Sequence, residues 1–380
     1  MKEAKANPRD NYLVIVPEQF TMQTQRQLVD LSENKAIMNI DVLSFKRLAY
    51  RVFDELGITN LTVLEETGKN LVLRKLAAQE ADKLGVIGRN LNRIGYISEV
   101  RSLLSELVQY NISPEELGRY IASGRLSDTL SDKLKDVLVL YEAFEKFMQD
   151  KYITAEEILN VLSNVAEESA ILRNSVIAFD EFTGFTPIQN QLIKKLFVIS
   201  KKIYVTLTID CREDIFKSRG MQELFDMPKR TVKSLTEMAA FYGIEVEEPI
   251  ILDKNYRLAE NEELSFMEQQ LFRKRRCSFK KVPKHIHIDC LRDPKQELTK
   301  IARRINELVR NENLRYRDIA IVTGDVNIYA GYVREIFDKY NIPYFIDATQ
   351  EILFHPFIEF IRSIPDIAAQ HSRQMRCSDF

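Results

Sequence analysis

Short apolar runs, each followed by a helical pattern, are the feature that most constrains how this chain can fold. Residues 12–16 (YLVIV) form an apolar run that is too short for a helix and is stopped by Pro17, and residues 39–43 form a second one. A helical pattern follows each run, and Gly57 closes the second helix. Strand, helix, strand, helix at this spacing predicts a parallel α/β sheet.

A long stretch between residues 62 and 170 interrupts this alternation. Apolar residues recur there every three or four positions in successive segments, and Ser113-Pro114 and Thr154 are typical helix starts. Hardly any segment in this stretch has the pattern of a strand. We therefore expect an all-helical block inserted into the α/β region.

The α/β pattern resumes after this block. The segments SVIAFD (175–180) and KKIYVTLTID (201–210) read as strands on either side of a helix. Beyond residue 276, the segments HIHIDCL, DIAIVTG and PYFID predict further strands between helices. The expected domains are a first α/β domain split into residues 1–61 and 171–275, a helical insertion at 62–170, and a second, incomplete α/β domain at 276–380.

Composition narrows the class of protein. The chain has 380 residues, of which 45% are hydrophobic and 29% charged, the profile of a soluble globular protein. It has no apolar run long enough for a membrane span, and its polar start is unlike a secretory signal. The four cysteines are scattered, which favours a reducing cytoplasm and argues against a metal or iron–sulfur site. The net charge of −2 means that any nucleic-acid contact must be local or come from a partner protein.

Two adjacent carboxylates, Asp180 and Glu181, end the strand SVIAFD. Ligands of parallel α/β sheets bind at the carboxyl ends of strands, where such a pair can order a hydrated Mg²⁺ and polarise a water molecule. Asp180 would then be the residue on the metal side and Glu181 the one that positions water. The alternative is an acidic exit from the strand that caps the helix near Pro187.

A nucleotide site would also need a phosphate-binding loop, G-x-x-x-x-G-K-[ST]. The nearest candidate, VLEETGKN, contains Gly68-Lys69 but has Val63 in place of the first glycine and Asn70 in place of Ser or Thr. It also lies in a helical pattern, so we reject it. Without the backbone cradle for phosphates, Asp180 and Glu181 do not complete an ATP site. Either the site has decayed or its loop precedes Met1 in a longer parent.

Several long segments, in order along the chain, resemble AddB, one of the two subunits of the AddAB ATP-dependent helicase–nucleases in their Gram-positive form. The matching segments cover about residues 11–365 and include LVIVPEQFTMQTQRQL, VLSFKRLAYRV, LSDKLKDVLVLYEAFEKFM, IAFDEFTGFTPIQNQLI, NYRLAENEELSFMEQQLF and LRYRDIAIVTGDVNIYAGYVREIFDKYNIPYFID.

This resemblance implies a fold class of P-loop-NTPase-like (RecA-like) helicase domains with a large all-helical insertion. It also implies an AddA-like partner subunit and single-stranded or broken double-stranded DNA as the nucleic acid, in repair of breaks by recombination. The chain departs from the family in lacking a phosphate loop and a nuclease domain with cluster cysteines, and its tail AAQHSRQMRCSDF does not look like the family's continuation. We therefore expect no cofactor in this fragment, whereas the full-length parent could bind Mg²⁺ and ATP.

The resemblance also implies DNA-contacting residues at the ends of the first strands. Polar and stacking contacts to single-stranded DNA are expected from Gln19, Thr21, Phe45, Arg47, Tyr50, Phe182 and Phe185. Aromatic stacking contributes about 1–3 kcal/mol per base. The alternatives are core packing for Phe45, Tyr50 and Phe182, and a solvated helix face for Arg47.

Three weaker signals lie further along the chain. Arg257 resembles the helicase arginine that senses the nucleotide across the domain cleft. The basic run at 273–281 (RKRRCSFKK) reads as a solvated linker, with a DNA backbone contact as the alternative. His285 and His287 share one face of an expected strand but have no third ligand in view, so no metal site is expected.

The sequence thus predicts a non-catalytic fragment that guides single-stranded DNA and senses the recombination hotspot within a two-subunit helicase–nuclease. An active ATPase or helicase subunit, whose phosphate loop lies upstream of Met1, is one alternative. A scaffold subunit that contacts its partner but not DNA is the other.

Overall fold

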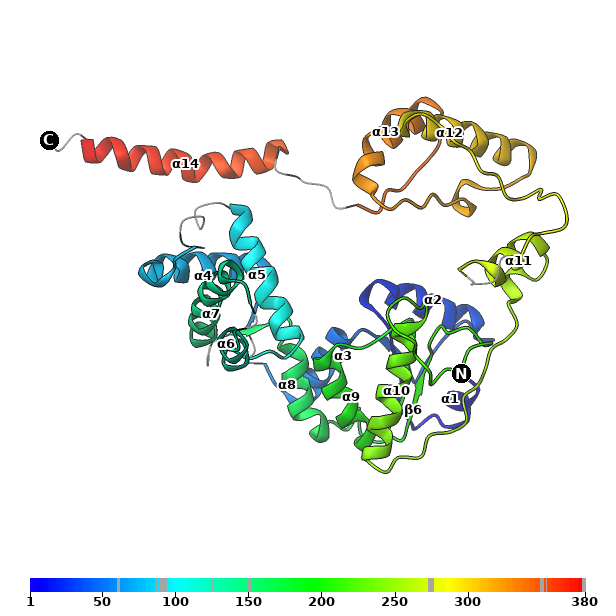
Figure 1. Cartoon of the computed structure of the whole chain (residues 1–380), viewed down its shortest axis with the longest axis horizontal. Helices are drawn as coiled ribbons and strands as arrows, with labels where there is room; N and C mark the ends of the chain where they lie inside the picture. Colours follow the sequence, from blue (N-terminus) through cyan, green and yellow to red (C-terminus); the bar gives the residue numbers. More distant parts are fainter. Residues whose placement is uncertain are drawn as a thin grey trace. The chain divides into compact units, whose positions relative to one another are not determined.

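The computed structural model describes residues 1–59, 62–86, 88, 94–124, 126–148, 152–272, 277–348, 352 and 354–377. The chain divides into two compact units, Met1–Tyr256 and Arg257–Phe380 (Figure 1). No helix in the described ranges has both the length and the apolar character needed to cross a membrane.

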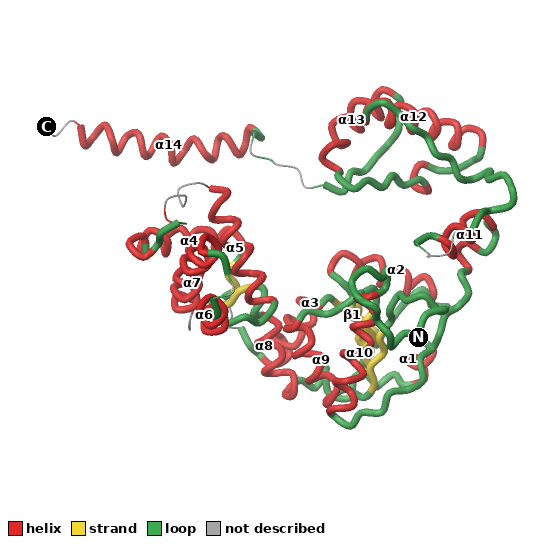
Figure 2. Tube along the Cα trace, in the orientation of Figure 1, coloured by secondary structure: helices red, strands yellow, loops and turns green. Residues whose placement is uncertain are grey.

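A four-stranded sheet forms the centre of the first unit. Its order is β2-β1-β5-β6, and all pairings are parallel (Figure 2). The strands are β1 (Tyr12–Ile15), β2 (Ile40–Leu43), β5 (Val176–Phe179) and β6 (Lys202–Val205). The prediction of a parallel α/β sheet interrupted between its second and third strands is therefore confirmed for this unit.

Helices cover the sheet and bury its apolar side chains. They are α1 (Lys2–Ala6), α2 (Thr21–Leu31), α3 (Phe45–Leu56), α9 (Pro187–Ile199) and α10 (Asp226–Phe241). Ser44 caps α3, and Gly57 ends it in the left-handed region at φ 68°, which glycine adopts without steric cost. Phe179 from β5 and Leu48 from α3 are fully buried in the shared core.

The helical block has a core of its own, formed by Leu73, Ile97 and Leu140 among others. Its helices are α4 (Glu66–Gln79), α5 (Ile94–Gln109), α6 (Pro114–Ala122) and α7 (Asp128–Met148). As Ser113-Pro114 predicted, Ser113 caps α6 in a reciprocal hydrogen-bond pair with Glu116. The two chain crossings at its base pair as the short parallel strands β3 (Val63–Leu64) and β4 (Ile153–Thr154).

The last helix of the inserted region, α8 (Ile158–Val165), packs elsewhere. It contacts α3 and α9, and its buried Ile158 and Leu162 belong to the core of the sheet. Thr154 lies before this helix, where its Oγ1 accepts a hydrogen bond from the backbone N–H of Glu157 at 3.2 Å. The helical block is therefore followed by a segment that already packs with the sheet.

The second unit contains α11 (Glu262–Gln270), α12 (Pro294–Asn311), α13 (Val326–Lys339) and α14 (Pro356–Cys377). Helices α12 and α13 pack together around Leu298, Ala302 and Phe337.

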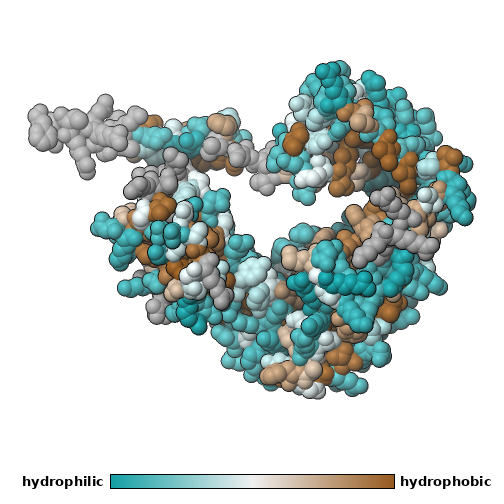
Figure 3. All heavy atoms as spheres, in the orientation of Figure 1, coloured by the Kyte–Doolittle hydropathy of each residue, from teal (hydrophilic) through white to brown (hydrophobic). Residues whose placement is uncertain are grey.

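The strands expected in HIHIDCL, DIAIVTG and PYFID are not formed, so that prediction is wrong for the described residues. These segments make no strand ladder with one another, and their apolar residues stay open to solvent, as for Ile288, Val322 and Phe345 at 95%, 93% and 88% exposure. Apolar side chains are visible at the surface of this unit in Figure 3. A short apolar run becomes a strand only when a neighbouring strand pairs with its backbone, and here none does.

Candidate nucleic-acid interface

The carboxyl ends of the central strands bring three loops to one edge of the sheet. Ile15 lies opposite both Leu43 and Phe179 in the parallel register. One residue further, the N–H of Val16 donates to the carbonyl of Leu43 at 3.0 Å, and the N–H of Asp180 donates to that of Ile15 at 3.0 Å. The segments PEQFT, SFKRLAY and DEFTGF therefore all leave the sheet at this edge, which we call the rim.

Glu18, Ser44 and Arg47 link the first two of these loops. The Nε of Arg47 donates to Oε1 of Glu18 at 3.1 Å, and the hydroxyl of Ser44 donates to Oε2 of the same carboxylate. Ser44 Oγ also accepts the backbone N–H of Arg47 at 3.3 Å, as the N-cap of α3. The side chains of Arg47 and Glu18 are 49% and 57% exposed, so this cation lies on the rim within an internal ion pair.

The other polar and tyrosine positions divide into exposed and buried. Gln19 is exposed within the short helix η1 (Glu18–Phe20). Thr21 is buried, and its hydroxyl donates to the carbonyl of Glu18 at 3.0 Å. Tyr50 is 39% exposed and packs edge-on against Phe53. Gln19 and Tyr50 can reach a ligand from where they lie, whereas Thr21 supports the loop.

Four phenylalanines form a cluster beneath the rim. Phe45 is 7% exposed and packs against Phe179, Phe182 and Phe185 with ring centroids 5.8, 5.6 and 6.4 Å away. This is the core-packing alternative that the sequence left open for Phe45. Phe182 and Phe185 are half-buried, with centroids 5.1 Å apart, and keep part of their ring surface open at the rim.

Asp180 and Glu181 lie where β5 ends, but they do not cap the next helix. Thr186 caps α9, in a reciprocal hydrogen-bond pair with Gln189, so that part of the structural alternative is wrong. Asp180 Oδ1 accepts a hydrogen bond from the hydroxyl of Thr206. Glu181 is exposed and has φ 63°, in the left-handed region that residues with a side chain rarely adopt.

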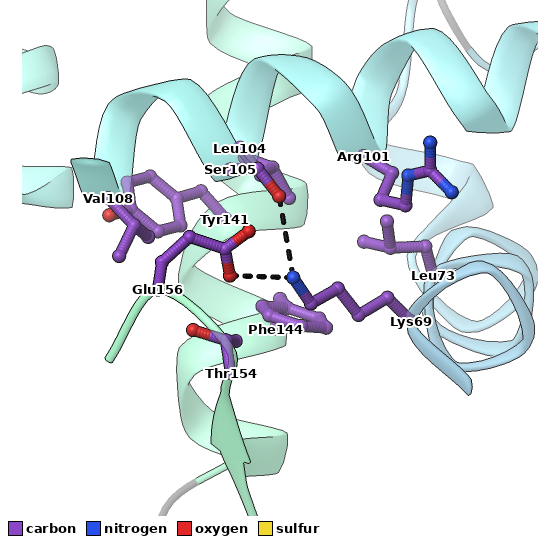
Figure 4. Close-up of a pocket in the computed structure, with 10 residues that line it drawn as sticks. All are labelled: Lys69, Leu73, Arg101, Leu104, Ser105, Val108, Tyr141, Phe144, Thr154 and Glu156. Carbon is purple, nitrogen blue, oxygen red and sulfur yellow. Dashed lines mark hydrogen bonds and ion pairs between the residues drawn. The ribbon is translucent and has the colours of Figure 1, made fainter. Parts of the chain in front are cut away.

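The residues present do not fit a complete Mg²⁺–ATP site. Gly68 and Lys69 lie inside α4, and Lys69 Nζ is bound to Glu156 at 2.6 Å within the helical block (Figure 4). Asp180 is engaged by Thr206 instead. Within the described ranges, no group of three or more His, Cys, Asp or Glu side chains is arranged to hold a metal ion.

The weaker sequence signals all fall at the boundary of the second unit or within it. Arg257 is exposed in the short helix η5 (Tyr256–Leu258). Of the basic run, residues 273–276 lie outside the described residues. His285 lies 3.5 Å from Glu263 through Nδ1, and both histidines are on the surface. These residues therefore belong to a different unit from the one that carries the rim.

Comparison with known proteins decides the family. The sequence profile described as "ADDB, N-terminal" matches residues 1–268, which is more than half of the chain.

The chain belongs to the AddB family.

Relatives that carry the AddB name in full, as the second subunit of an ATP-dependent helicase/deoxyribonuclease, agree with this. The protein of Lachnoclostridium phytofermentans is 37% identical over 369 residues, covering 96% of this chain and 32% of the relative. That of Clostridium tetani is 32% identical over 371 residues, and that of Caldanaerobacter subterraneus 34% over 358 residues, covering 95% and 93% of this chain and 32% and 30% of the relatives. The chain thus spans about a third of the length of these AddB relatives.

Sequence reasoning missed Glu18 and Ser44. Ser44 carries a signal, because a serine directly before an amphipathic run is a typical N-cap. Nothing in the sequence around Glu18 indicates that its carboxylate reaches the start of α3, since the two residues are 26 positions apart.

Proposed function

We propose that the rim of this AddB-family chain guides single-stranded DNA and senses the hotspot sequence, as a non-catalytic part of a two-subunit helicase–nuclease. The partner would be an AddA-like subunit, the substrate broken double-stranded DNA, and the compartment the cytoplasm. Repair of DNA breaks by recombination, as the family implies, would be the context.

We further propose the domain division behind this function. Residues 1–61 and 171–275 would form a split RecA-like domain around the insertion at 62–170, and residues 276–380 an incomplete second one. The sheet order β2-β1-β5-β6, with the interruption between its halves, supports the first of these assignments.

One observation carries the DNA proposal: the parallel register places the loops after β1, β2 and β5 at one edge of the sheet. That edge presents an arginine, an amide, a half-exposed tyrosine and two half-buried phenylalanines, namely Arg47, Gln19, Tyr50, Phe182 and Phe185. Cations that contact phosphates, together with aromatic faces that stack on bases, are the usual elements of single-strand binding.

Fluorescence anisotropy with a labelled single-stranded oligonucleotide tests this proposal. We expect the chain to bind, and Arg47→Ala and Tyr50→Ala each to weaken binding. For Arg47→Ala, the slope of log affinity against log salt should fall by about 0.7, the value for one phosphate contact on a single strand. Lys201→Ala is the matched control, because Lys201 pairs with Asp10 where β6 and β1 begin, at the opposite edge of the sheet.

Equally negligible binding by the wild type and all variants would refute the DNA proposal. That result would favour the scaffold alternative, in which the chain contacts only its partner protein.

A further inference from the structure

The loop between β6 and α10, residues 206–225, begins at the rim and has no helix or strand of its own. Connections of this length inside a compact domain are uncommon and are usually functional. Neither the sequence patterns nor the family resemblance singled it out.

Both ends of this loop are attached to the rim. At its start, the N–H of Thr206 donates to the carbonyl of Phe179 at 2.9 Å, and its hydroxyl donates to Asp180. At its end, the hydroxyl of Thr231 in α10 donates to the carbonyl of Thr183 at 3.1 Å. The loop surface is therefore continuous with the surface of DEFTGF.

Buried ion pairs hold the loop in one shape. Lys229 of α10 has a side chain only 3% exposed, and its Nζ lies 2.7 Å from Glu213 and 3.3 Å from Glu223. Asp210 accepts two hydrogen bonds from the guanidinium of Arg212, both at 3.0 Å. A buried cation that is bound to two loop carboxylates cannot be released without a large desolvation penalty, so the loop stays ordered.

The loop separates its charges between interior and surface. Residues 206–230 contain five acidic and five basic side chains, so the segment has no net charge. The acidic groups turn inward, with Asp210, Glu223 and Asp226 at 5%, 18% and 9% exposure. Lys217 and Arg219 point outward at 81% and 74% exposure. The outer surface is therefore cationic, although the composition is neutral.

An exposed aromatic ring lies beside these cations. Phe216 is 55% exposed, and its backbone N–H donates to Oδ1 of Asp214 at 3.0 Å, which fixes the turn that presents the ring. A solvent-facing phenylalanine next to cations suits a nucleobase, whose flat face replaces water on the ring while the phosphates meet the cations.

We propose that the 206–225 loop is a second binding site for the single strand that the rim guides, with Lys217 and Arg219 contacting phosphates and Phe216 stacking on a base. The ligand class is single-stranded nucleic acid, bound without reading its sequence. This inference rests on the proposed function and lengthens the track by the nucleotides that lie beyond the rim.

The test compares oligonucleotides of about 5 and about 15 nucleotides, within the range of single-strand site sizes, by anisotropy on the whole chain. Lys217→Ala/Arg219→Ala should lower the salt slope for the long oligonucleotide by about 1.4, the value for two phosphate contacts, and leave short-oligonucleotide binding unchanged. Phe216→Ala should weaken long-oligonucleotide binding about 10-fold. The control Lys201→Ala/Lys202→Ala removes two cations at the opposite edge, and melting by circular dichroism confirms that each variant is folded.

The outcomes separate the two proposals. If Arg47→Ala weakens binding of both lengths while the loop variants bind like the wild type, the loop proposal is overturned and the rim proposal stands. If the loop variants weaken binding and Arg47→Ala does not, the loop binds nucleic acid and the rim proposal fails. If the wild type binds neither length, both fail.

Discussion

Glu18 Oε1 lies 3.1 Å from Nε of Arg47, so the cation that we propose for DNA binding is already paired within the protein. Ser44 donates to the other oxygen of the same carboxylate at the start of α3. A DNA phosphate would meet the same two donors that Glu18 now occupies. The glutamate therefore competes with the ligand and sets how easily Arg47 is released.

Removing the negative charge of Glu18 should strengthen DNA binding. An exposed ion pair contributes up to about 1 kcal/mol, so Glu18→Gln should raise single-strand affinity by roughly 2- to 5-fold in anisotropy titrations. The control is Asp41→Asn, which removes the same charge from the partner of Arg51 on the same helix, at 3.6 Å. An equal gain in both variants would mean that only overall charge matters.

Phe45 and Tyr50 should separate stability from binding. Phe45 is buried among three other rings, so Phe45→Ala should lower the free energy of unfolding by about 3–5 kcal/mol. Tyr50 is partly exposed, so Tyr50→Ala should weaken DNA binding and cost much less stability. Urea denaturation and anisotropy on the same samples measure both effects. A stable Phe45→Ala variant with lost binding would return Phe45 to the interface.

The buried pair of Lys69 and Glu156 should be costly to break from one side. The two side chains are 3% and 10% exposed and lie 2.6 Å apart, so Lys69→Met leaves a buried carboxylate without its cation. We expect a loss of about 3–5 kcal/mol in urea denaturation. The double variant Lys69→Met/Glu156→Leu should recover most of this loss, because it removes both charges. No recovery would show that packing, not charge, dominates this site.

Acid should weaken the same contact. Burial acts to raise the pKa of Glu156, but the hydrogen bond and charge of Lys69 outweigh it, so its pKa lies below the ordinary 4.5. A depressed carboxyl pKa adds stability above about pH 4.5, and this is lost as the pH falls through the folded value. The difference in unfolding free energy between the wild type and Glu156→Gln should therefore shrink from pH 6 to pH 3. A difference that is constant with pH would contradict this linkage.

Local patterns predicted the elements of the first unit well, but not the contacts between them. Apolar runs and caps located the strands, α3, α6 and α9, since these signals lie within a few residues of one another. The same reasoning failed for HIHIDCL, DIAIVTG and PYFID, which have the apolar character of strands but no neighbouring strand in the described residues. Strand formation needs a partner, and a single segment carries no information about one.

By itself, the sequence determined the family, the parallel α/β pattern and its interruption by helices, because those depend on residue order and short-range periodicity. Only the tertiary structure decided which candidate side chains face solvent. Phe45 and Tyr50 are five residues apart on one helix, yet one is buried and the other open. The pairing of Glu18 with Arg47 and the outward cations of the 206–225 loop also depend on the fold. Burial and ion pairing are set by groups distant in sequence, which meet only when the sheet and its helices pack.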